Sequence, residues 1–550
     1  MELSQSLPLR QDQFSDLHQE VLSAYSLLQT QHQQQKLELI EYKCQANYWQ
    51  AQFKHVKSKE AELLDKITEL EATVRKREQQ LFGRSSEHGT TQSEAQNKAK
   101  KIKLKRGQQL GSQGHGKRSY EQLPSVEETI SLIPQKSICA CCGLPFDELP
   151  ITEDSQIIEV INVQAYQRII RRKMYERHCD CKIEDAGKRL ITAPVAERLI
   201  PKSKLGTSVW ALLLIKKYAY QQPLNRALTE LAANGLPLAI GTIVDGWKKL
   251  LPQLMPIYDA IVERNLQANH WHADETGWRV FEHIEGKGNH RWYLWIFSNQ
   301  ETVVYKLDPS RSSGVPKAHF GNETSGILSV DRYAAYKVIA KAGLLVLAFC
   351  WAHVRRDFLS HAKSYPKEEA WALDWVERIG TLYHLNNERI AFPPKSSSFK
   401  KAHALLAKKV AAFRQQLDDQ LKQIERLTPA KSVLISLNNH WEGLTIFVDR
   451  PDIPMDNNKA ERGLRNPVIG RKTYYGSGSV WSGELAVVMF TIFSTLNLWK
   501  LNTHIWLLAY FQECAVASGT PASIEKFLPW NMTDKQKILF SQPPIGEESG

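Results

Sequence analysis

Residues 14–81 contain neither proline nor glycine, and a stretch of this length without a helix breaker predicts one long helix. The segment is rich in Gln, Glu, Lys and Leu, which favour helix. Its apolar residues follow the alternating four- and three-residue steps of a heptad repeat, at Leu63, Ile67, Leu70, Val74 and Leu81. Arg77 occupies the one missing apolar position. We therefore predict a coiled coil over residues 14–87 that joins two protomers; the alternative is an amphipathic helix packed on its own domain.

A flexible, basic linker is predicted over residues 88–124, where the composition changes to Ser, Gly, Gln, Lys and His. The chain of 550 residues has 71 Lys and Arg against 59 Asp and Glu, a net charge of +12. Eight of the bases and no acid lie between Lys98 and Arg118. The segment is either a solvated tether or, as we favour, an arm that binds DNA phosphates. The candidate phosphate contacts are Lys101, Lys103, Lys105 and Arg106.

Two close groups of cysteines fall in residues 125–197, a segment whose β-branched runs predict short strands. The chain has 8 cysteines, too few for a disulfide framework, so the clustering favours a metal site. Cys139-x-x-Cys142 has the spacing of a zinc knuckle, and in ERHCDCK His178-x-x-Cys181 keeps that spacing. We predict one structural Zn²⁺ bound by Cys139, Cys142, His178 and Cys181. Cys179 in place of His178 is the alternative ligand, and free thiols in a small core are the alternative to a zinc site.

Three helices are predicted over residues 198–258, from the runs GTSVWALLLIKKYAY, PLNRALTELAANG and LAIGTIVDGWKKLLPQL. The second and third flank a turn that contains glycine, which is typical of a helix-turn-helix that binds DNA. Three packed helices without any DNA contact are an equally good interpretation of this pattern.

Five β-rich runs follow from His270 and predict a mixed α/β domain over residues 259–500: HWHADETGWRVF, RWYLWIFS, TVVYKL, GILSVDRYAAY and LLVLAFCWA. The four tryptophans of the first two runs are expected in its core. A helical insertion at about 365–430 and a helical tail over 501–550 complete the chain. The N-terminus lacks the apolar core of a signal peptide, and residues 485–499 are too short and too polar to span a membrane, so we expect a cytoplasmic protein.

Three acids stand at positions suited to bind metal. Asp274 is expected at the end of the first β-run, Asp331 at the end of the fourth, and Glu461 in a helix that begins at about Asn457. Two strand-end carboxylates and a third from a nearby helix can hold two hard cations such as Mg²⁺ through oxygen ligands. Such a pair promotes attack on a phosphodiester and stabilises the leaving oxygen. Taken singly, each acid is more simply explained as a cap or a solvated residue.

The segments HADETGW, SVDRYAAY, CWAHVRRDF and DNNKAERGLRNPVIGRK, in this order, resemble the DDE transposases of the insertion sequence 66 family. The resemblance covers nearly the whole chain, and the DNNKAER run with its downstream GRK is the most specific part. It implies a ribonuclease H-like fold whose triad corresponds to Asp274, Asp331 and Glu461, with two catalytic Mg²⁺ ions. It also implies binding of the ends of a mobile DNA element, cleavage there, and strand transfer into target DNA.

Residues beside these motifs receive roles as hypotheses. The resemblance implies phosphate contacts by Arg462, Arg471 and Lys472. Arg465, one helical turn after Glu461, either orients that carboxylate, contacts phosphate, or forms a simple intrahelical ion pair. Asp456 or Asn457 is expected to cap the helix, and Asn457 and Asn458 are expected to cap it or touch DNA. Cys350 and His353 share the spacing of a metal pair, but no second pair is near them in sequence. We interpret Cys350 as a core residue and His353 as an active-site neighbour or a satisfied polar residue.

The predicted partners are double-stranded DNA, both element ends and target, and a second copy or a higher oligomer on that DNA. The resemblance adds accessory proteins of the same element, and no membrane is expected. Two other functions stay open: a non-catalytic DNA-binding regulator or domesticated transposase, and a nuclease of the same fold without strand transfer. The presence of all three acids favours an enzyme over the regulator.

Overall fold

The computed structural model describes residues 11–82, 165, 174–176, 190–192, 197–285, 289–423 and 428–541. The chain forms two compact units, of which the first comprises residues 1–87, 355–384 and 415–434 and the second the remainder. The predicted phosphate contacts of the linker and the four predicted zinc ligands lie outside the described residues, so both stay predictions. The short strands β1 (Met174–Glu176) and β2 (Leu190–Thr192) pair antiparallel, within the segment whose composition predicts strands.

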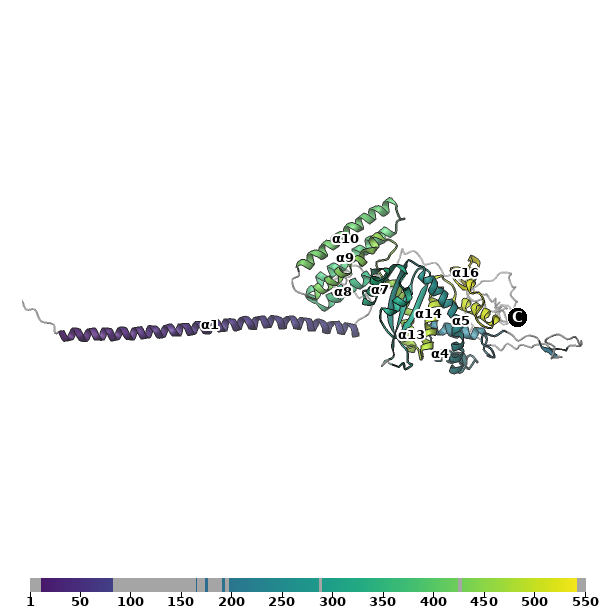
Figure 1. The fold of residues 1–550 in the computed structure, drawn as a ribbon, viewed down its shortest axis with the longest axis horizontal. Coiled ribbons are helices and arrows are strands. Elements are labelled where there is room, and N and C mark those ends of the chain that lie inside the picture. Colours follow the sequence, from purple (N-terminus) through teal and green to yellow (C-terminus); the bar gives the residue numbers. More distant parts are fainter. Residues whose placement is uncertain are drawn as a thin grey trace, which may run out of the picture. The chain divides into compact units, whose positions relative to one another are not determined.

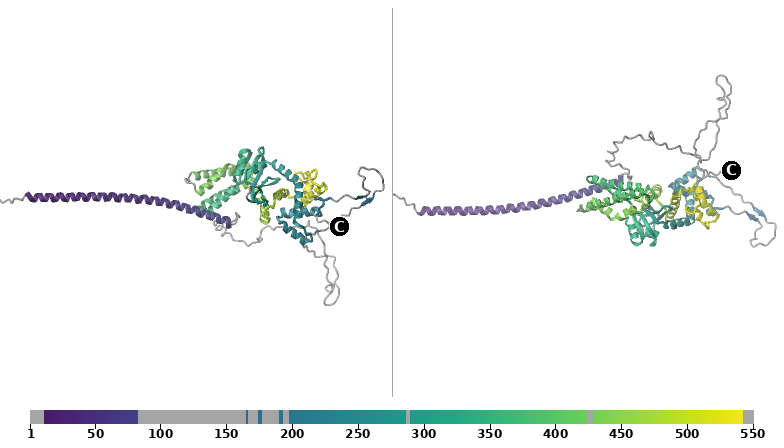
Figure 2. Two further views of the ribbon diagram at one scale, coloured as in Figure 1. Left: turned by 60° about the horizontal axis from the view of Figure 1, so that its bottom comes forward. Right: turned by 90° about the horizontal axis from the view of Figure 1, so that it is seen from above.

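The first unit contains α1 (Gln11–Phe82), a continuous helix of 72 residues (Figure 1, Figure 2). At 1.5 Å per residue it is about 110 Å long. The predicted heptad side chains are more than half exposed: Leu63, Ile67, Leu70 and Val74. Ala72 is buried, and it lies about 200° around the helix from Leu70. The face that packs within the unit is therefore opposite to the heptad seam, which stays exposed.

Helices follow β7 (Leu344–Phe349) as far as Asp449, and the helical insertion predicted at about 365–430 lies within this part of the chain. They are α8 (Trp351–Ser364), the 3₁₀ turn Pro366–Glu368, α9 (Glu369–Ile390), α10 (Ser397–Gln423), α11 (Pro429–Asn439) and α12 (Trp441–Asp449). In the first unit, the rings of Phe358 on α8 and Trp375 on α9 stack with centroids 5.6 Å apart. The indole N–H groups of Trp371 and Trp375 both donate to Gln420 Oε1 on α10, at 2.9 and 3.1 Å. These partly buried hydrogen bonds join α9 to α10.

The second unit contains a mixed sheet of five strands. They are β3 (His270–Arg279), β4 (Arg291–Ser298), β5 (Val303–Asp308), β6 (Ser325–Val330) and β7 (Leu344–Phe349), in the order β5-β4-β3-β6-β7. The strands β3, β4 and β5 pair antiparallel, whereas β6 and β7 run parallel to β3. The mixed α/β class predicted from the sequence is confirmed. The predicted core is also confirmed, because four tryptophans of β3 and β4 are buried: Trp271, Trp278, Trp292 and Trp295.

Helix α14 (Val480–Leu498) protects the edge strand β5 of this sheet. The buried hydroxyls of Thr491 and Thr495 accept hydrogen bonds from the backbone N–H groups of Tyr305 and Val303, at 3.0 and 3.1 Å. Unpaired edge groups of a sheet otherwise favour aggregation. By length and composition α14 is apolar enough to cross a membrane, but 67% of its apolar 18-residue window is buried. It is the core helix of this fold.

Three helices precede the sheet: α3 (Thr207–Tyr218), α4 (Leu224–Ala233) and α5 (Ile240–Leu266). Helix α5 continues through Pro252 and Pro256, so the domain boundary predicted after residue 258 falls inside a helix. The remaining helices are α6 (Gly314–Phe320), α7 (Ala334–Ala342), α13 (Asn458–Tyr474), α15 (Thr503–Val516), the 3₁₀ turn Glu525–Phe527 and α16 (Asp534–Ser541). Helices α5 and α14 pack on β5, and α13 packs on β3 and β4 (Figure 1).

Candidate active site

Asp274 lies in the middle of β3, so the prediction that it ends a strand is wrong. The reason is the hairpin with β4, whose pairing continues from His272 to Arg279 and extends the strand past the acid. On the other side of β3, pairing with β6 stops at His272. Asp274 therefore lies just beyond the parallel ladder. Its Oδ1 accepts a hydrogen bond from the backbone N–H of Glu275 at 2.9 Å.

Asp331 directly follows β6, as the sequence predicts. His272 is the register partner of Ser329, and Asp274 and Asp331 each lie two residues farther along. Side chains two residues apart on a strand point to the same face. The two aspartates therefore lie side by side on neighbouring strands, each two residues beyond the register pair His272 and Ser329. The backbone N–H of Tyr333 donates to Asp331 Oδ1 at 2.9 Å and orients it.

Glu461 is in the first turn of α13, the helix that packs on β3 and β4. Gly463 makes this close packing possible. A Cβ at that position would lie 2.3 Å from Ile296 Cδ1 of β4, closer than real atoms approach. The glycine two residues after the acid therefore brings the start of α13 down onto the sheet.

The carboxylates of the site influence one another through their charges. The pKa of Asp274 is raised from 3.8 to about 7, chiefly because burial disfavours the charged form. The negative charge of Glu275 raises it further, and those of Asp331 and Glu461 add smaller contributions, against the lowering effect of the Glu275 N–H. Near neutral pH, Asp274 therefore favours either a proton or a cation. A divalent cation fits this donor set because it relieves the repulsion and prefers carboxylate oxygen.

Asn457 joins the elements that carry the site, which differs from the expectation that it caps α13 or touches DNA. Its side chain is 1% exposed and makes no capping bond. The Nδ2 group donates to the carbonyl of Ala273 at 2.7 Å, so Oδ1 is the acceptor for His272 Nδ1 at 3.0 Å. Burial lowers the pKa of His272 to about 3, so its ring is neutral. The Asn457 N–H donates to Cys350 Sγ at 3.2 Å. Asn457 is therefore a buried positioning residue.

Glu275 is a residue of the site that sequence reasoning missed. Its side chain is 1% exposed, and its carboxylate accepts hydrogen bonds from Arg311 Nε at 2.8 Å and Tyr336 Oη at 2.6 Å. Burial raises the pKa of Glu275, and these two bonds oppose the rise. The guanidinium of Arg311 also stacks on the ring of Tyr333, 3.9 Å from its centroid. Through Arg311, Glu275 thus contacts Tyr333, whose backbone N–H orients Asp331. Only its place beside Asp274 in the sequence hinted at this.

Cys350, His353 and Glu461 form a compact group of different chemistry. The thiol sulfur, a ring nitrogen and a carboxylate oxygen all lie within 4.8 Å of one another. Among the described residues, this is the one set of three His, Cys, Asp or Glu ligands found that close together. Cys350 is 1% exposed, as its interpretation as a core residue requires. His353 Nε2 lies 3.7 Å from Glu461 Oε1, so His353 is a neighbour of the candidate catalytic acid.

The basic residues of α13 divide into two groups. Arg462, Arg465 and Lys472 are exposed. Arg471 is partly buried and donates to Thr276 Oγ1 at 3.1 Å and to the carbonyl of Gly277. Arg471 therefore fastens the last turn of α13 to β3, a role inside the fold that the predicted phosphate contact did not anticipate.

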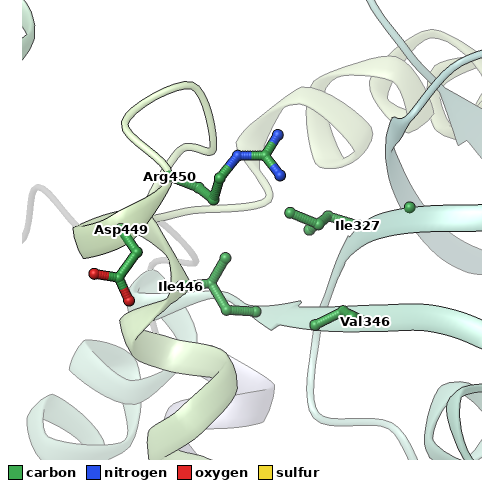
Figure 3. A pocket seen from close by; sticks show the side chains of 6 residues that line it. Ile327, Val346, Ile446, Asp449 and Arg450 are labelled. Carbon is green, nitrogen blue, oxygen red and sulfur yellow. The ribbon is translucent and has the colours of Figure 1, made fainter.

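A cavity of about 410 Å³ lies at the beginning of β6 and β7, beside α12. Figure 3 shows Ile327, Val346 and Ile446 facing its interior, with Arg450 above them and the Asp449 carboxylate turned away. Asp331 follows the opposite end of β6. This mainly aliphatic cavity therefore lies away from Asp331.

Comparison with known proteins identifies a family that matches this chain. The family model described as "Transposase IS66 family" matches residues 202–485, more than half of the chain. Three relatives are uncharacterized proteins of Sinorhizobium fredii (strain NBRC 101917 / NGR234). Protein y4jD is 25% identical over 431 residues, covering 75% of this chain and 81% of its own. Protein y4hP is 23% identical, with 74% and 75% covered, and y4qI is 26% identical, with 71% and 73% covered.

Proposed function

Because the chain belongs to the IS66 family of transposases, we propose that it binds the ends of a mobile DNA element and catalyses metal-dependent cleavage and strand transfer there. In the first step water attacks a phosphodiester at the element end. In the second step the freed 3′-OH attacks target DNA. Both steps are in-line displacements at phosphorus, so one set of carboxylates serves both without a covalent enzyme intermediate.

The observation that carries this proposal is the convergence of three acids from distant segments. Asp274 and Asp331 continue the same level of two neighbouring strands, and Glu461 enters from α13, close enough for its charge to raise the pKa of Asp274. A buried carboxylate surrounded by like charges is costly unless a cation or a chemical role compensates. The family supplies the same expectation from its transposase activity.

Asp274, Asp331 and Glu461 are the residues that would hold divalent cations, with Mg²⁺ as the proposed ion. When bound, such cations activate the attacking oxygen and stabilise the leaving oxygen. The chain's own contribution is to hold the carboxylates in place. The Glu275 and Tyr333 backbone N–H groups orient the two aspartates, and Gly463 lets α13 bring Glu461 to the sheet. Asp274 must lose its proton before it can act as a ligand.

The proposed catalytic domain is ribonuclease H-like. Three antiparallel strands followed by two strands parallel to the first, in the order β5-β4-β3-β6-β7, support this assignment. The helices α9 to α12 would be the insertion between the second and third acids.

DNA binding and pairing of two ends are assigned to the remaining segments. The exposed bases Arg465 and Lys472 on α13 are proposed to contact phosphate near the acids. The helices of residues 198–258 and the basic linker are proposed to bind element ends, and the last turns of α5, which include Asp259, lie beyond that segment. The exposed seam of α1, which includes Leu63 and Leu70, is proposed to pair with a second copy as a coiled coil and bring two ends together. We also propose a cytoplasmic location, where the protein would meet these DNA partners.

The experiment that tests this function uses purified protein, Mg²⁺ and linear DNA that carries the element's own ends. Wild type is compared with Asp331→Asn and with Asp259→Asn, which changes an exposed aspartate on α5. We expect nicked and joined products from wild type and Asp259→Asn, and neither product from Asp331→Asn with end binding retained. Binding without cleavage by any protein would favour the regulator or a required accessory protein. Cleavage that survives in Asp331→Asn would refute the proposed active site.

A further inference from the structure

The compact group of Cys350, His353 and Glu461 is held by the backbone around it. Cys350 follows β7, and its N–H donates to the carbonyl of Val330 at 3.2 Å. Trp351, the first residue of α8, donates its N–H to the carbonyl of Met455 at 2.9 Å. The start of α8 and the approach to α13 are thus bonded directly to each other. The three side chains meet at a fixed junction of β7, α8 and α13.

The ligand types at this junction are those of a thiophilic metal site. A thiolate, an imidazole and a carboxylate are all ligands of Zn²⁺, whereas Mg²⁺ avoids sulfur and nitrogen in favour of oxygen. With metal–ligand distances of about 2.0–2.1 Å, nitrogen and oxygen ligands of a tetrahedral ion lie about 3.4 Å apart. The separation of 3.7 Å between His353 Nε2 and Glu461 Oε1 needs only a small adjustment to reach that value.

The burial of the group also suits a bound ion with one open position. Cys350 is 1% exposed, whereas the side chains of His353 and Glu461 are 26% and 29% exposed. The sulfur and Glu461 Oε1, which has almost no exposed surface, therefore lie at the inner end, while other atoms of the His353 and Glu461 side chains reach solvent. The Asn457 N–H that donates to Cys350 Sγ would stabilise negative charge on the sulfur. Three protein ligands and an accessible fourth position are the pattern of a zinc site that exchanges water.

We propose that Cys350, His353 and Glu461 form a site for a thiophilic divalent ion such as Zn²⁺, and that this ion inhibits the enzyme by withdrawing Glu461 from the carboxylate centre. The inhibition rests on the proposed function, because Glu461 is the one residue that the two sites share. Binding of the ion does not rest on it. The carboxylate of Glu461 cannot serve both arrangements fully, so occupancy of one site weakens the other.

Cobalt binding tests the site without any catalysis. Co²⁺ is added to metal-free full-length wild type, Cys350→Ser and Cys514→Ser, and the cobalt–thiolate absorption in the near ultraviolet is recorded. Cys514 is a matched control because it is also buried, on α15, and lies outside the group. The predicted zinc site of residues 125–197 contributes equally to all three proteins, so difference spectra isolate Cys350. We expect part of the absorption to be lost in Cys350→Ser and none in Cys514→Ser. Equal spectra for all three proteins would refute the site.

A second variant guards against misfolding of Cys350→Ser. His353→Gln leaves the buried sulfur in place, and we expect it to weaken Co²⁺ binding at this site by about tenfold or more. Unchanged affinity in His353→Gln would also refute the ligand set.

Inhibition is tested by the ratio of Mg²⁺-dependent cleavage with and without added Zn²⁺, taken within each protein. We expect Cys350→Ser to need more Zn²⁺ for the same fractional loss than wild type and Cys514→Ser. Equal sensitivity would refute the inhibitory role. A lost cobalt signal in Cys350→Ser together with no cleavage by wild type would leave the metal site standing and count against the proposed function alone.

Discussion

Asp274→Asn is expected to stabilise the metal-free protein while it abolishes cleavage. The carboxylate of Asp274 is buried near Glu275, Asp331 and Glu461, and its pKa is raised to about 7. The folded protein therefore holds the proton more tightly than the unfolded chain does. The contribution of the protonated Asp274 to the free energy of unfolding is fully present below pH about 4, and it is lost as the pH rises towards 7. Asparagine stays neutral at every pH and keeps the oxygen that accepts the Glu275 N–H.

The magnitude follows from the two pKa values of Asp274, 3.8 for an ordinary aspartate and about 7 in the fold. One pKa unit corresponds to about 1.4 kcal/mol. The raised pKa of Asp274 then lowers the free energy of unfolding by about 4 kcal/mol at pH 8 but by only about 1.7 kcal/mol at pH 5. The advantage of Asp274→Asn over wild type should therefore grow by about 2.5 kcal/mol between pH 5 and pH 8.

The assay is urea unfolding in EDTA, followed by the fluorescence of the buried tryptophans of β3 and β4, at pH 5 and pH 8. Asp259→Asn, on the exposed side of α5, is the control and should track wild type at both values. Added Mg²⁺ should stabilise wild type at pH 8 and have a smaller effect on Asp274→Asn. The reasoning is refuted if Asp274→Asn has the same advantage at both pH values, or is less stable than wild type at pH 8.

Three further changes probe the supports of the site and the proposed dimer. Tyr336→Phe removes one hydrogen bond to Glu275 and should cost about 1 kcal/mol of unfolding free energy; it should also slow cleavage, measured on gels, with end binding unchanged. Gly463→Ala places a methyl group against Ile296 and should cost about 1–3 kcal/mol in urea unfolding; equal stability would show that α13 can shift. Leu70→Lys puts a charge into the exposed heptad seam and should convert a dimer into a monomer in sedimentation; a wild type that is already monomeric would contradict the coiled coil.

The strands of the sheet could be predicted because their hydrophobic runs are local signals. RWYLWIFS coincides with β4, and the strand before Asp331 ends where its apolar run ends. The position of Asp274 could not be predicted in the same way. Its strand continues because β4 pairs with it across a hairpin, and the length of that pairing is not written in the sequence around Asp274.

The contacts that assemble the site were beyond sequence reasoning because they join distant segments. Cys350 and His353 showed a metal-pair spacing, but their third neighbour, Glu461, comes from a helix after the whole insertion. Asn457 is a residue type that commonly caps helices. Its side chain instead forms hydrogen bonds with the carbonyl of Ala273 and the ring of His272, two buried groups that need polar partners. For Asn457, tertiary burial overrode the local preference for a capping role.

The central claim is that Asp274, Asp331 and Glu461 act as one metal-dependent centre. The most direct test is the rate of strand cleavage at element ends for Asp274→Asn, Asp331→Asn, Glu461→Gln and the triple variant, with end binding measured in parallel. Residues that act as a unit lose activity together, so each single variant should fall nearly as far as the triple variant while all four still bind DNA. Cleavage near the wild-type rate in any one single variant would contradict the claim.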